Sequence, residues 1–150
     1  MASRKIEDLT PRMQKKIILF EERLEAAVPG AFKRSCTHRS QQEQNALWKR
    51  GRCALDIVNE AYRAAGLAEI TAEENRRPVT WTVLSVHTAR EGVDYFIECE
   101  GKYCTDIKVD TDGDNVEDWK EFGRIAAECG LEWGGTWKKA DLCHVQWRDT

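Results

Sequence analysis

The spacing of apolar residues changes along this 150-residue chain. In the first part, up to Gly66, apolar side chains recur every three or four positions, which is typical of helices that bury one face. Further on, β-branched and aromatic residues alternate with polar ones, which is typical of half-buried strands. Helices are expected over residues 11–27, from Ser40 onward, over 54–65 and over 116–129, and strands over 79–84, 93–97, 105–109 and 143–147. Helices followed by a small antiparallel sheet with one inserted helix define an α+β fold.

Residues that cap helices stand at the ends of these periodic segments. Thr10 suits the N-cap of the first helix, with Pro11 at the first helical position. Ser40 and Glu43 form a capping-box pattern, in which each side chain bonds to the backbone of the other residue. Gly66 is placed to end the third helix. The sequence therefore predicts where these helices start and stop.

The composition is that of a globular protein. Hydrophobic residues make up 41% of the chain and charged residues 33%, which is enough for a core and a polar surface. A chain of this length is expected to form a single domain over 1–150, with an N-terminal helix in 1–35 and the main core in 36–150.

Charge and hydropathy exclude two classes of partner. The net charge is −3 and no basic face is evident, so nucleic acid is not an expected partner. The first residues lack the apolar run of a signal peptide, and no stretch has the apolar length of a transmembrane helix. The protein is therefore expected to be made in the cytoplasm, with no membrane insertion.

The six cysteines contain no Cys-x-x-Cys pair. In a cytoplasmic protein they are expected to be free thiols rather than a disulfide framework. Cys99 and Cys104 have the spacing of two thiols on either side of a hairpin turn. A disulfide or a structural zinc at this pair is the alternative.

Two of the three histidines stand near aspartates. His87 closes the tripeptide that begins at Ser85, and Asp94 follows it by seven residues; Asp141 precedes His144 by three. Two imidazoles and one carboxylate suit a zinc ion with one open position, and a second carboxylate nearby suits a base. Taken singly, the same residues are equally typical of a loop histidine, a surface strand residue and a turn former. His38, the third histidine, is expected to lie outside the site.

Three separated motifs resemble, in the same order, those of the zinc D-alanyl-D-alanine carboxypeptidase and L-alanyl-D-glutamate endopeptidase family, which includes small phage endolysins. The first runs from Arg39-Ser40 through Gln44 and Trp48 to Gly51-Arg52, the second is Ser85-x-His87 with Asp94, and the third joins Trp133-Gly-Gly-Thr-Trp137 to Asp141-x-x-His144-x-Gln146. The resemblance spans about residues 39–147, and three motifs in order are more specific than any one.

The resemblance implies a fold like that of the Hedgehog and D-Ala-D-Ala peptidase group, with one zinc ion per chain. The implied zinc ligands are His87, Asp94 and His144. Asp141 would be the general base and acid, and Arg39 would contact the scissile carbonyl or a substrate carboxylate. Supporting or substrate-binding positions would be Ser85, Gln44 and Trp137.

The function that the resemblance implies is cleavage of the stem peptides of bacterial peptidoglycan by a monomeric enzyme. An L-alanyl-D-glutamate endopeptidase fits a small chain without a signal peptide, as in a phage endolysin released through a holin pore. The alternatives are a D-Ala-D-Ala carboxypeptidase or dipeptidase and a non-catalytic zinc module that binds the wall.

The chain departs from the family pattern at two positions near the expected ligands. Arg90 stands where the family usually has glycine, and Gly92 where it usually has alanine. The stretches 53–80 and 94–109 are also longer than expected. These differences concern the shape of the cleft more than the metal site.

An acidic stretch runs from Asp110 to Asp114. Alternating aspartates with a glycine can begin a calcium loop. Because Gly113 comes before the place where an EF-hand loop has its glycine, and no glutamate is expected at the twelfth place, an acidic turn before a helix is predicted, with Asp114 as N-cap. A calcium site is the alternative.

Overall fold

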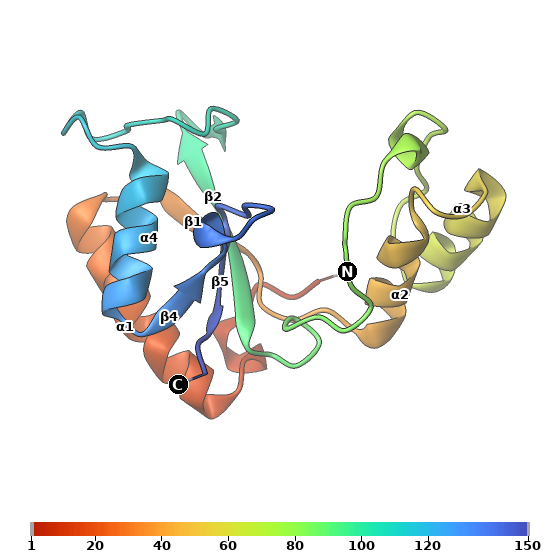
Figure 1. The fold of residues 1–150 in the computed structure, drawn as a ribbon, viewed down its shortest axis with the longest axis horizontal. Helices are drawn as coiled ribbons and strands as arrows, with labels where there is room; N and C mark the ends of the chain where they lie inside the picture. Colours follow the sequence, from red (N-terminus) through yellow and green to blue (C-terminus); the bar gives the residue numbers. More distant parts are fainter. Residues whose placement is uncertain (1, 150) are drawn as a thin grey trace.

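The computed structural model describes residues 2–149 and confirms the α+β fold (Figure 1). The helices are α1 (Pro11–Ala27), α2 (Gln41–Lys49), α3 (Leu55–Ala64) and α4 (Asp118–Glu128). The strands are β1 (Phe32–Cys36), β2 (Gly92–Cys99), β3 (Lys102–Tyr103), β4 (Leu131–Trp133) and β5 (His144–Trp147). Short 3-10 turns lie at Ile6–Asp8, Glu74–Arg76 and Gly134–Thr136.

The sheet is antiparallel, with strand order β1-β2-β5-β4, and β3 pairs with the far end of β2. In this register Asp94 on β2 faces His144 on β5. On its other side Asp94 faces Cys36 of β1, next to an irregularity in the pairing. Facing residues in an antiparallel pair have side chains in contact. The sheet therefore brings together residues that are 50 positions apart in sequence.

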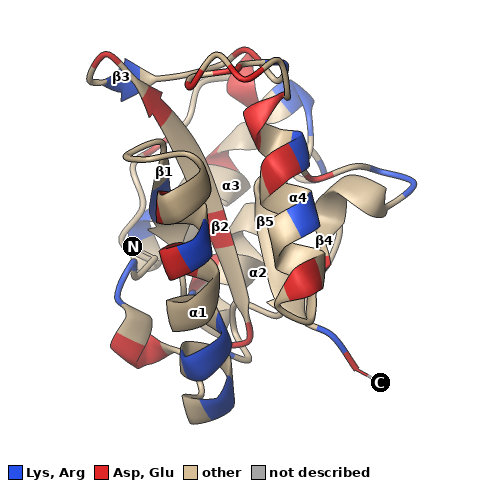
Figure 2. Ribbon diagram, turned by 90° about the vertical axis from the view of Figure 1, so that its left-hand side faces the viewer, with Lys and Arg blue, Asp and Glu red and all other residues tan. Residues whose placement is uncertain are grey.

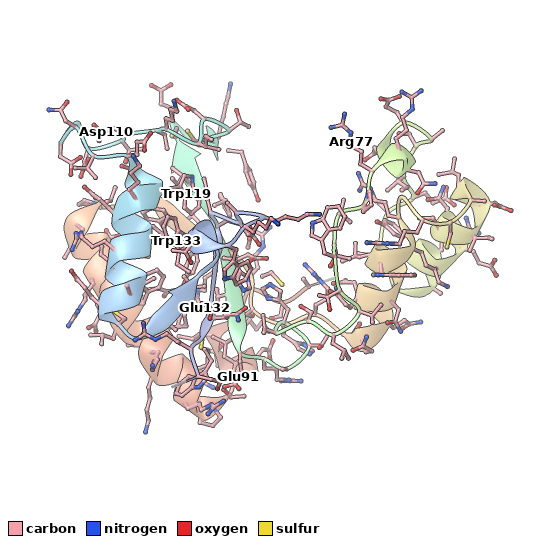
Figure 3. The ribbon with its side chains drawn as sticks, in the orientation of Figure 1. Arg77, Glu91, Asp110, Trp119, Glu132 and Trp133 are labelled. Carbon is pink, nitrogen blue, oxygen red and sulfur yellow. The ribbon has the colours of Figure 1, made fainter. Side chains whose placement is uncertain are left out.

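The main core lies between the sheet and the helices α1 and α4. Phe20 of α1, Tyr95 of β2 and Phe122 of α4 meet edge to face, with ring centroids 5.1–5.7 Å apart. Such aromatic contacts add to the free energy gained by burying the rings. Gly123 lets α4 approach the sheet, because a Cβ there would come within 2.2 Å of the Trp133 ring. Figure 3 shows Trp119 and Trp133 in this region.

A second, smaller core joins α2 and α3. Its buried residues are Ala46, Val58, Tyr62 and Ile70. Figure 1 shows this helical pair standing apart from α1 and α4, linked to the sheet by two stretches of irregular chain. The molecule thus has two hydrophobic clusters, and α1 belongs to the one that contains the sheet.

The predicted helix ends agree closely with the structure. Thr10 caps α1 by accepting a hydrogen bond from the backbone of Met13, and Ser40 caps α2 in the same way from Glu43. Gly66 follows α3 with φ +77°, a left-handed conformation that glycine adopts without steric cost. None of the helices within the described residues is long and apolar enough to cross a bilayer.

Two predicted strands are wrong. Residues 79–84 form no strand, since the Thr80 and Thr82 hydroxyls bond to the backbone two residues on and hold an irregular conformation. Residues 105–109 also form no strand, because the carboxylate of Asp106 accepts the N–H of Lys108 in a local turn. Alternating β-branched residues make a strand only where a partner strand is available.

Other details also differ from expectation. Helix α4 begins at Asp118, and its N-cap position is Glu117, so Asp114 is not the cap. The short strands β1, β3 and β4 were not predicted. None of them has the length or the strict alternation that identifies a strand in sequence.

Candidate metal centre and cleft

His87, Asp94 and His144 lie together. The Nε2 atom of His87 is 3.1 Å from Oδ2 of Asp94, and Nδ1 of His144 is 2.8 Å from Oδ1 of the same carboxylate. Asp94 and His144 come from the paired central strands, and His87 comes from the tight turn that precedes β2. One carboxylate therefore joins both imidazoles, each through a different oxygen.

The burial of this cluster perturbs its protonation. Burial raises the pKa of Asp94, but hydrogen bonds from His144 and His87 lower it more, so this pKa lies well below its usual range. Burial lowers the pKa of His144, but the hydrogen bond and the attraction of Asp94 raise it more, and the net pKa lies above its ordinary value. The two imidazoles therefore stabilise the charged form of the Asp94 carboxylate that lies between them.

The donor set fits zinc. Two imidazole nitrogens and a carboxylate oxygen are ligands that Zn²⁺ takes in a tetrahedral site with an open position. Ligand atoms about 2.0–2.2 Å from such an ion are roughly 3.3–3.6 Å from one another, somewhat more than the 3.1 and 2.8 Å found here. The buried Nδ1 of His87 has no hydrogen-bond partner within the described residues. An unsatisfied buried nitrogen is uncommon and is consistent with a bound water or ion near this ring.

Asp141 lies beside this cluster. One of its carboxylate oxygens is within 4.8 Å of an Asp94 oxygen. Its side chain is exposed and lines the cleft, and its Oδ1 accepts a hydrogen bond from the Cys143 thiol at 3.1 Å. The backbone N–H of Asp141 donates to Gly134 at 2.9 Å, where a Cβ would come within 2.5 Å of the Asp141 carbonyl oxygen. The double-glycine turn thus lets this segment pass close enough to place the carboxylate.

A hydrogen-bonded chain behind His144 orients its ring. Nε2 of His144 is 2.9 Å from Oε1 of Gln146, whose amide donates to Glu132 at 3.2 Å. The indole N–H of Trp137 donates to the same Glu132 oxygen at 3.0 Å. Partners of this kind fix which nitrogen of a ligating histidine faces the metal. Glu132 was not predicted, because only the pairing of β4 with β5 places it opposite Gln146.

Two cysteines near the cluster were also not predicted as neighbours of the site. The Cys36 sulfur lies within 4.8 Å of donor atoms of both His87 and Asp94, and the Cys143 sulfur is equally close to Asp94 and Asp141. Burial raises the pKa of Cys36 to about 11, and burial also raises that of Cys143. Both side chains are therefore neutral thiols at pH 7. Cys99 and Cys104, the pair considered in sequence, are free thiols on either side of the β2–β3 turn.

Arg39 reaches the same cleft from the start of the α2 segment. Its Nη1 donates to Oε1 of Gln44 at 2.8 Å, and its Nε is 3.5 Å from the carboxylate of Glu43. Gln44 is fully buried, and its amide donates to the Thr80 hydroxyl and the Thr82 carbonyl. Gln44 therefore ties Arg39 to the irregular segment that forms one wall of the cleft.

The turn that carries His87 is built by local contacts. The Ser85 hydroxyl accepts the backbone N–H of His87 at 3.1 Å, which is a supporting role. Arg90 has φ +64°, a left-handed conformation that glycine adopts without steric cost and that most other residues avoid. Gly92 is required here because a Cβ would come within 2.4 Å of Val86 and 3.1 Å of the His144 ring.

The cluster opens on a cleft of about 1040 Å³. Its polar and aromatic lining includes Arg39, Arg50, Trp81, Trp137, Lys139 and Asp141. Trp81 is 63% exposed, and Lys139 lies over its ring at 3.5 Å. The Asp94 carboxylate, two imidazoles and several cationic side chains therefore line one cleft. His38 is not among the residues that line it.

Comparison with known proteins adds a family and a related fold. Residues 52–147 match a family described as D-alanyl-D-alanine carboxypeptidase; Arg39 and Gln44 precede this segment. The chain is similar to the crystal structure of the Serratia marcescens L-Ala D-Glu endopeptidase ChiX, with 22% identity and a TM-score of 0.57 over 99% of this chain and 89% of that one. At this identity the likeness concerns the fold. A search of curated proteins finds no match.

Proposed function

The chain belongs to the D-alanyl-D-alanine carboxypeptidase family of peptidases, and from this premise we propose that it is a zinc-dependent endopeptidase that cuts the L-Ala–D-Glu bond of peptidoglycan stem peptides. The observation that carries the proposal is the Asp94 carboxylate between two imidazoles, with the Asp141 carboxylate beside it in an open cleft. The family match agrees with the resemblance inferred from the three sequence motifs.

In this proposal His87, Asp94 and His144 hold the zinc ion. When bound, zinc supplies a Lewis acid that polarises the scissile carbonyl and lowers the pKa of water. Ligand binding requires each imidazole nitrogen that faces Asp94 to give up its proton. The hydrogen bonds that link His144 to Gln146, and Gln146 to Glu132, hold the His144 ring in one orientation.

Asp141 is placed to move protons. An exposed carboxylate near the ligand cluster can accept a proton from the attacking water on its Oδ2 atom. The same atom then returns that proton to the leaving amine nitrogen, which must be protonated before the peptide bond breaks. Oδ1 is engaged by the Cys143 thiol, which restricts rotation of the carboxylate.

Arg39 supplies positive charge to the same cleft. Its guanidinium is half-buried and oriented by Gln44 and Glu43, so little side-chain entropy remains to be lost on binding. A planar fork of N–H donors suits either the developing oxyanion or a substrate carboxylate.

The choice of bond rests on the cleft. It is open, large and lined by the cations Arg39, Arg50 and Lys139, which suits an internal stretch of peptide that carries the D-Glu carboxylate. The solved relative with this fold is described as an L-Ala D-Glu endopeptidase. The same cations would also suit the C-terminal carboxylate of D-Ala-D-Ala, which makes a carboxypeptidase the second candidate.

A soluble muropeptide that carries a pentapeptide stem separates these two activities. Cleavage at L-Ala–D-Glu releases a peptide with a new N-terminal D-Glu, and carboxypeptidase action releases free D-Ala. Mass analysis of the products identifies the bond. Release of D-Ala alone would overturn the endopeptidase assignment while leaving the zinc peptidase assignment intact.

We further propose that the protein acts as a phage or prophage endolysin that reaches the wall through a holin pore. The support is the resemblance of the three sequence motifs to a family that includes small phage endolysins. Expression with and without a holin tests this role. Lysis only in the presence of the holin is expected, and equal lysis in both cultures would contradict it.

Replacing Gln44 by leucine is expected to lower kcat/KM roughly 10–100-fold and to destabilise the fold, with zinc content unchanged. Leucine fills the space but leaves the Thr82 carbonyl and an Arg39 N–H without their buried partner, at about 1–3 kcal/mol for each unsatisfied group. Thermal unfolding and cleavage rates check this. Gln42→Leu, on the exposed side of the same helix, is the control, and equal losses in both variants would contradict the positioning role of Gln44.

A further inference from the structure

The acidic stretch before α4 matches a twelve-residue calcium loop. Counted from Asp110, the positions that supply carboxylate oxygens in an EF-hand loop fall on acidic residues. These are Asp110, Asp112, Asp114, Asp118 and Glu121, at places one, three, five, nine and twelve. The expectation that no glutamate stands at the twelfth place is wrong, because Glu121 occupies it, although Gly113 does lie two places before the sixth. We propose that residues 110–121 bind a calcium ion.

The structure brings these carboxylates together in two overlapping groups. Oxygens of Asp110, Asp112 and Asp118 lie within 4.8 Å of one another, and so do oxygens of Asp112, Asp114 and Glu121. Asp112 belongs to both groups, so the two groups are adjacent. Ca²⁺ takes six to eight oxygen ligands at about 2.3–2.6 Å, and five carboxylates supply most of them.

The burial of Glu121 is evidence for a bound cation that does not depend on the clustering of acidic side chains. Its side chain is only 6% exposed, and its Oε2 atom has no hydrogen-bond partner within the described residues. A buried, unsatisfied carboxylate oxygen costs free energy unless a cation or a proton binds there. In EF-hand loops the glutamate at this place binds calcium with both oxygens. Glu121 is therefore positioned to close the site from the first turns of α4.

The backbone also follows the pattern. The sixth position of an EF-hand loop makes a sharp turn and is usually glycine. Here it is Asn115, with φ +67°, and asparagine is among the few residues with a side chain that tolerate this conformation. Helix α4 starts at Asp118, near the place where the exiting helix of such a loop begins. No helix enters the loop from the other side, since residues 104–109 are irregular.

The location separates this site from the zinc cluster. Figure 2 shows acidic residues gathered on the loop that precedes α4 and on the first turn of that helix. Figure 3 places Asp110 beyond the N-terminal end of α4. None of the five acidic residues lines the cleft. The calcium site therefore stands independently of the proposed peptidase activity.

Terbium luminescence tests the site itself. Tb³⁺ binds in calcium sites and is excited by a nearby indole, and Trp119 directly follows the ligand position Asp118. Titration of the zinc-loaded protein with Tb³⁺ is expected to give saturable emission that Ca²⁺ displaces. Glu121→Gln and Asp112→Asn are each expected to weaken binding roughly tenfold or more, because each removes a charged ligand. The exposed Asp112 provides a variant whose fold is not at risk.

Glu128→Gln is the matched control, since it removes one exposed charge from the other end of α4. It should bind Tb³⁺ as wild type does. Calcium should also raise the midpoint of thermal unfolding of wild type and of this control, but not of Glu121→Gln. Emission that does not saturate, that Ca²⁺ does not displace, or that is equal in all the variants would overturn the proposal, whatever the peptidase activity proves to be.

Discussion

Asp141→Asn is expected to reduce peptidoglycan cleavage by roughly 10²–10⁴-fold, the usual contribution of a general base and acid, with zinc content and fold preserved. Asparagine has the same shape but cannot take a proton from water or return one to the leaving amine. The side chain is exposed, so its replacement leaves no buried group unpaired. A loss of this size with the metal retained would distinguish a peptidase from a zinc module that only binds the wall.

The measurement is the initial rate of cleavage of purified peptidoglycan, with metal analysis of the same samples. Asp149→Asn is the control, because it is an exposed aspartate near the same end of the chain and does not line the cleft. It should retain the wild-type rate. If Asp141→Asn cleaved as fast as this control, Asp141 would not be the base.

Asp94→Asn is expected to have the second large effect, through loss of the metal. The substitution removes the carboxylate that contacts both His87 and His144. Because a zinc site depends on deprotonated ligands and on their charge, zinc content should fall from about one ion per chain to a small fraction. Cleavage should fall with it, by at least as much as in Asp141→Asn.

Metal analysis after dialysis against a weak chelator separates this variant from the previous one. Asp141→Asn should keep its zinc under conditions in which Asp94→Asn loses it. Thermal unfolding shows whether Asp94→Asn still folds, and Asp149→Asn again serves as control. Full retention of zinc by Asp94→Asn would show that zinc binds at another site in the protein.

Local signals in the sequence predict the helices well. The caps at Thr10 and Ser40 and the glycine at Gly66 act on neighbouring residues only, so their effect does not depend on the rest of the fold. Strands depend on partners that are distant in sequence. Residues 79–84 have the composition of a strand, but Gln44 and local threonine contacts hold them as a cleft wall instead.

The same distinction applies to the site. His87, Asp94, Asp141 and His144 could be proposed from motifs, because their spacing is characteristic. Glu132 and Cys36 could not, since only the register of the sheet places them beside the motif residues. The acidic loop is a different case. Its twelve-residue spacing is present in the sequence, but only the structure shows that Glu121 is buried, and this burial is what supports a cation site.

Digestion of purified peptidoglycan by the zinc-loaded protein, with mass analysis of the fragments, tests the zinc endopeptidase most directly. Fragments with a new N-terminal D-Glu are expected, together with their loss after removal of zinc by a chelator and their return when zinc is added back. Fragments that continue to form in protein proven free of zinc, or no cleavage by the fully zinc-loaded protein, would contradict this expectation.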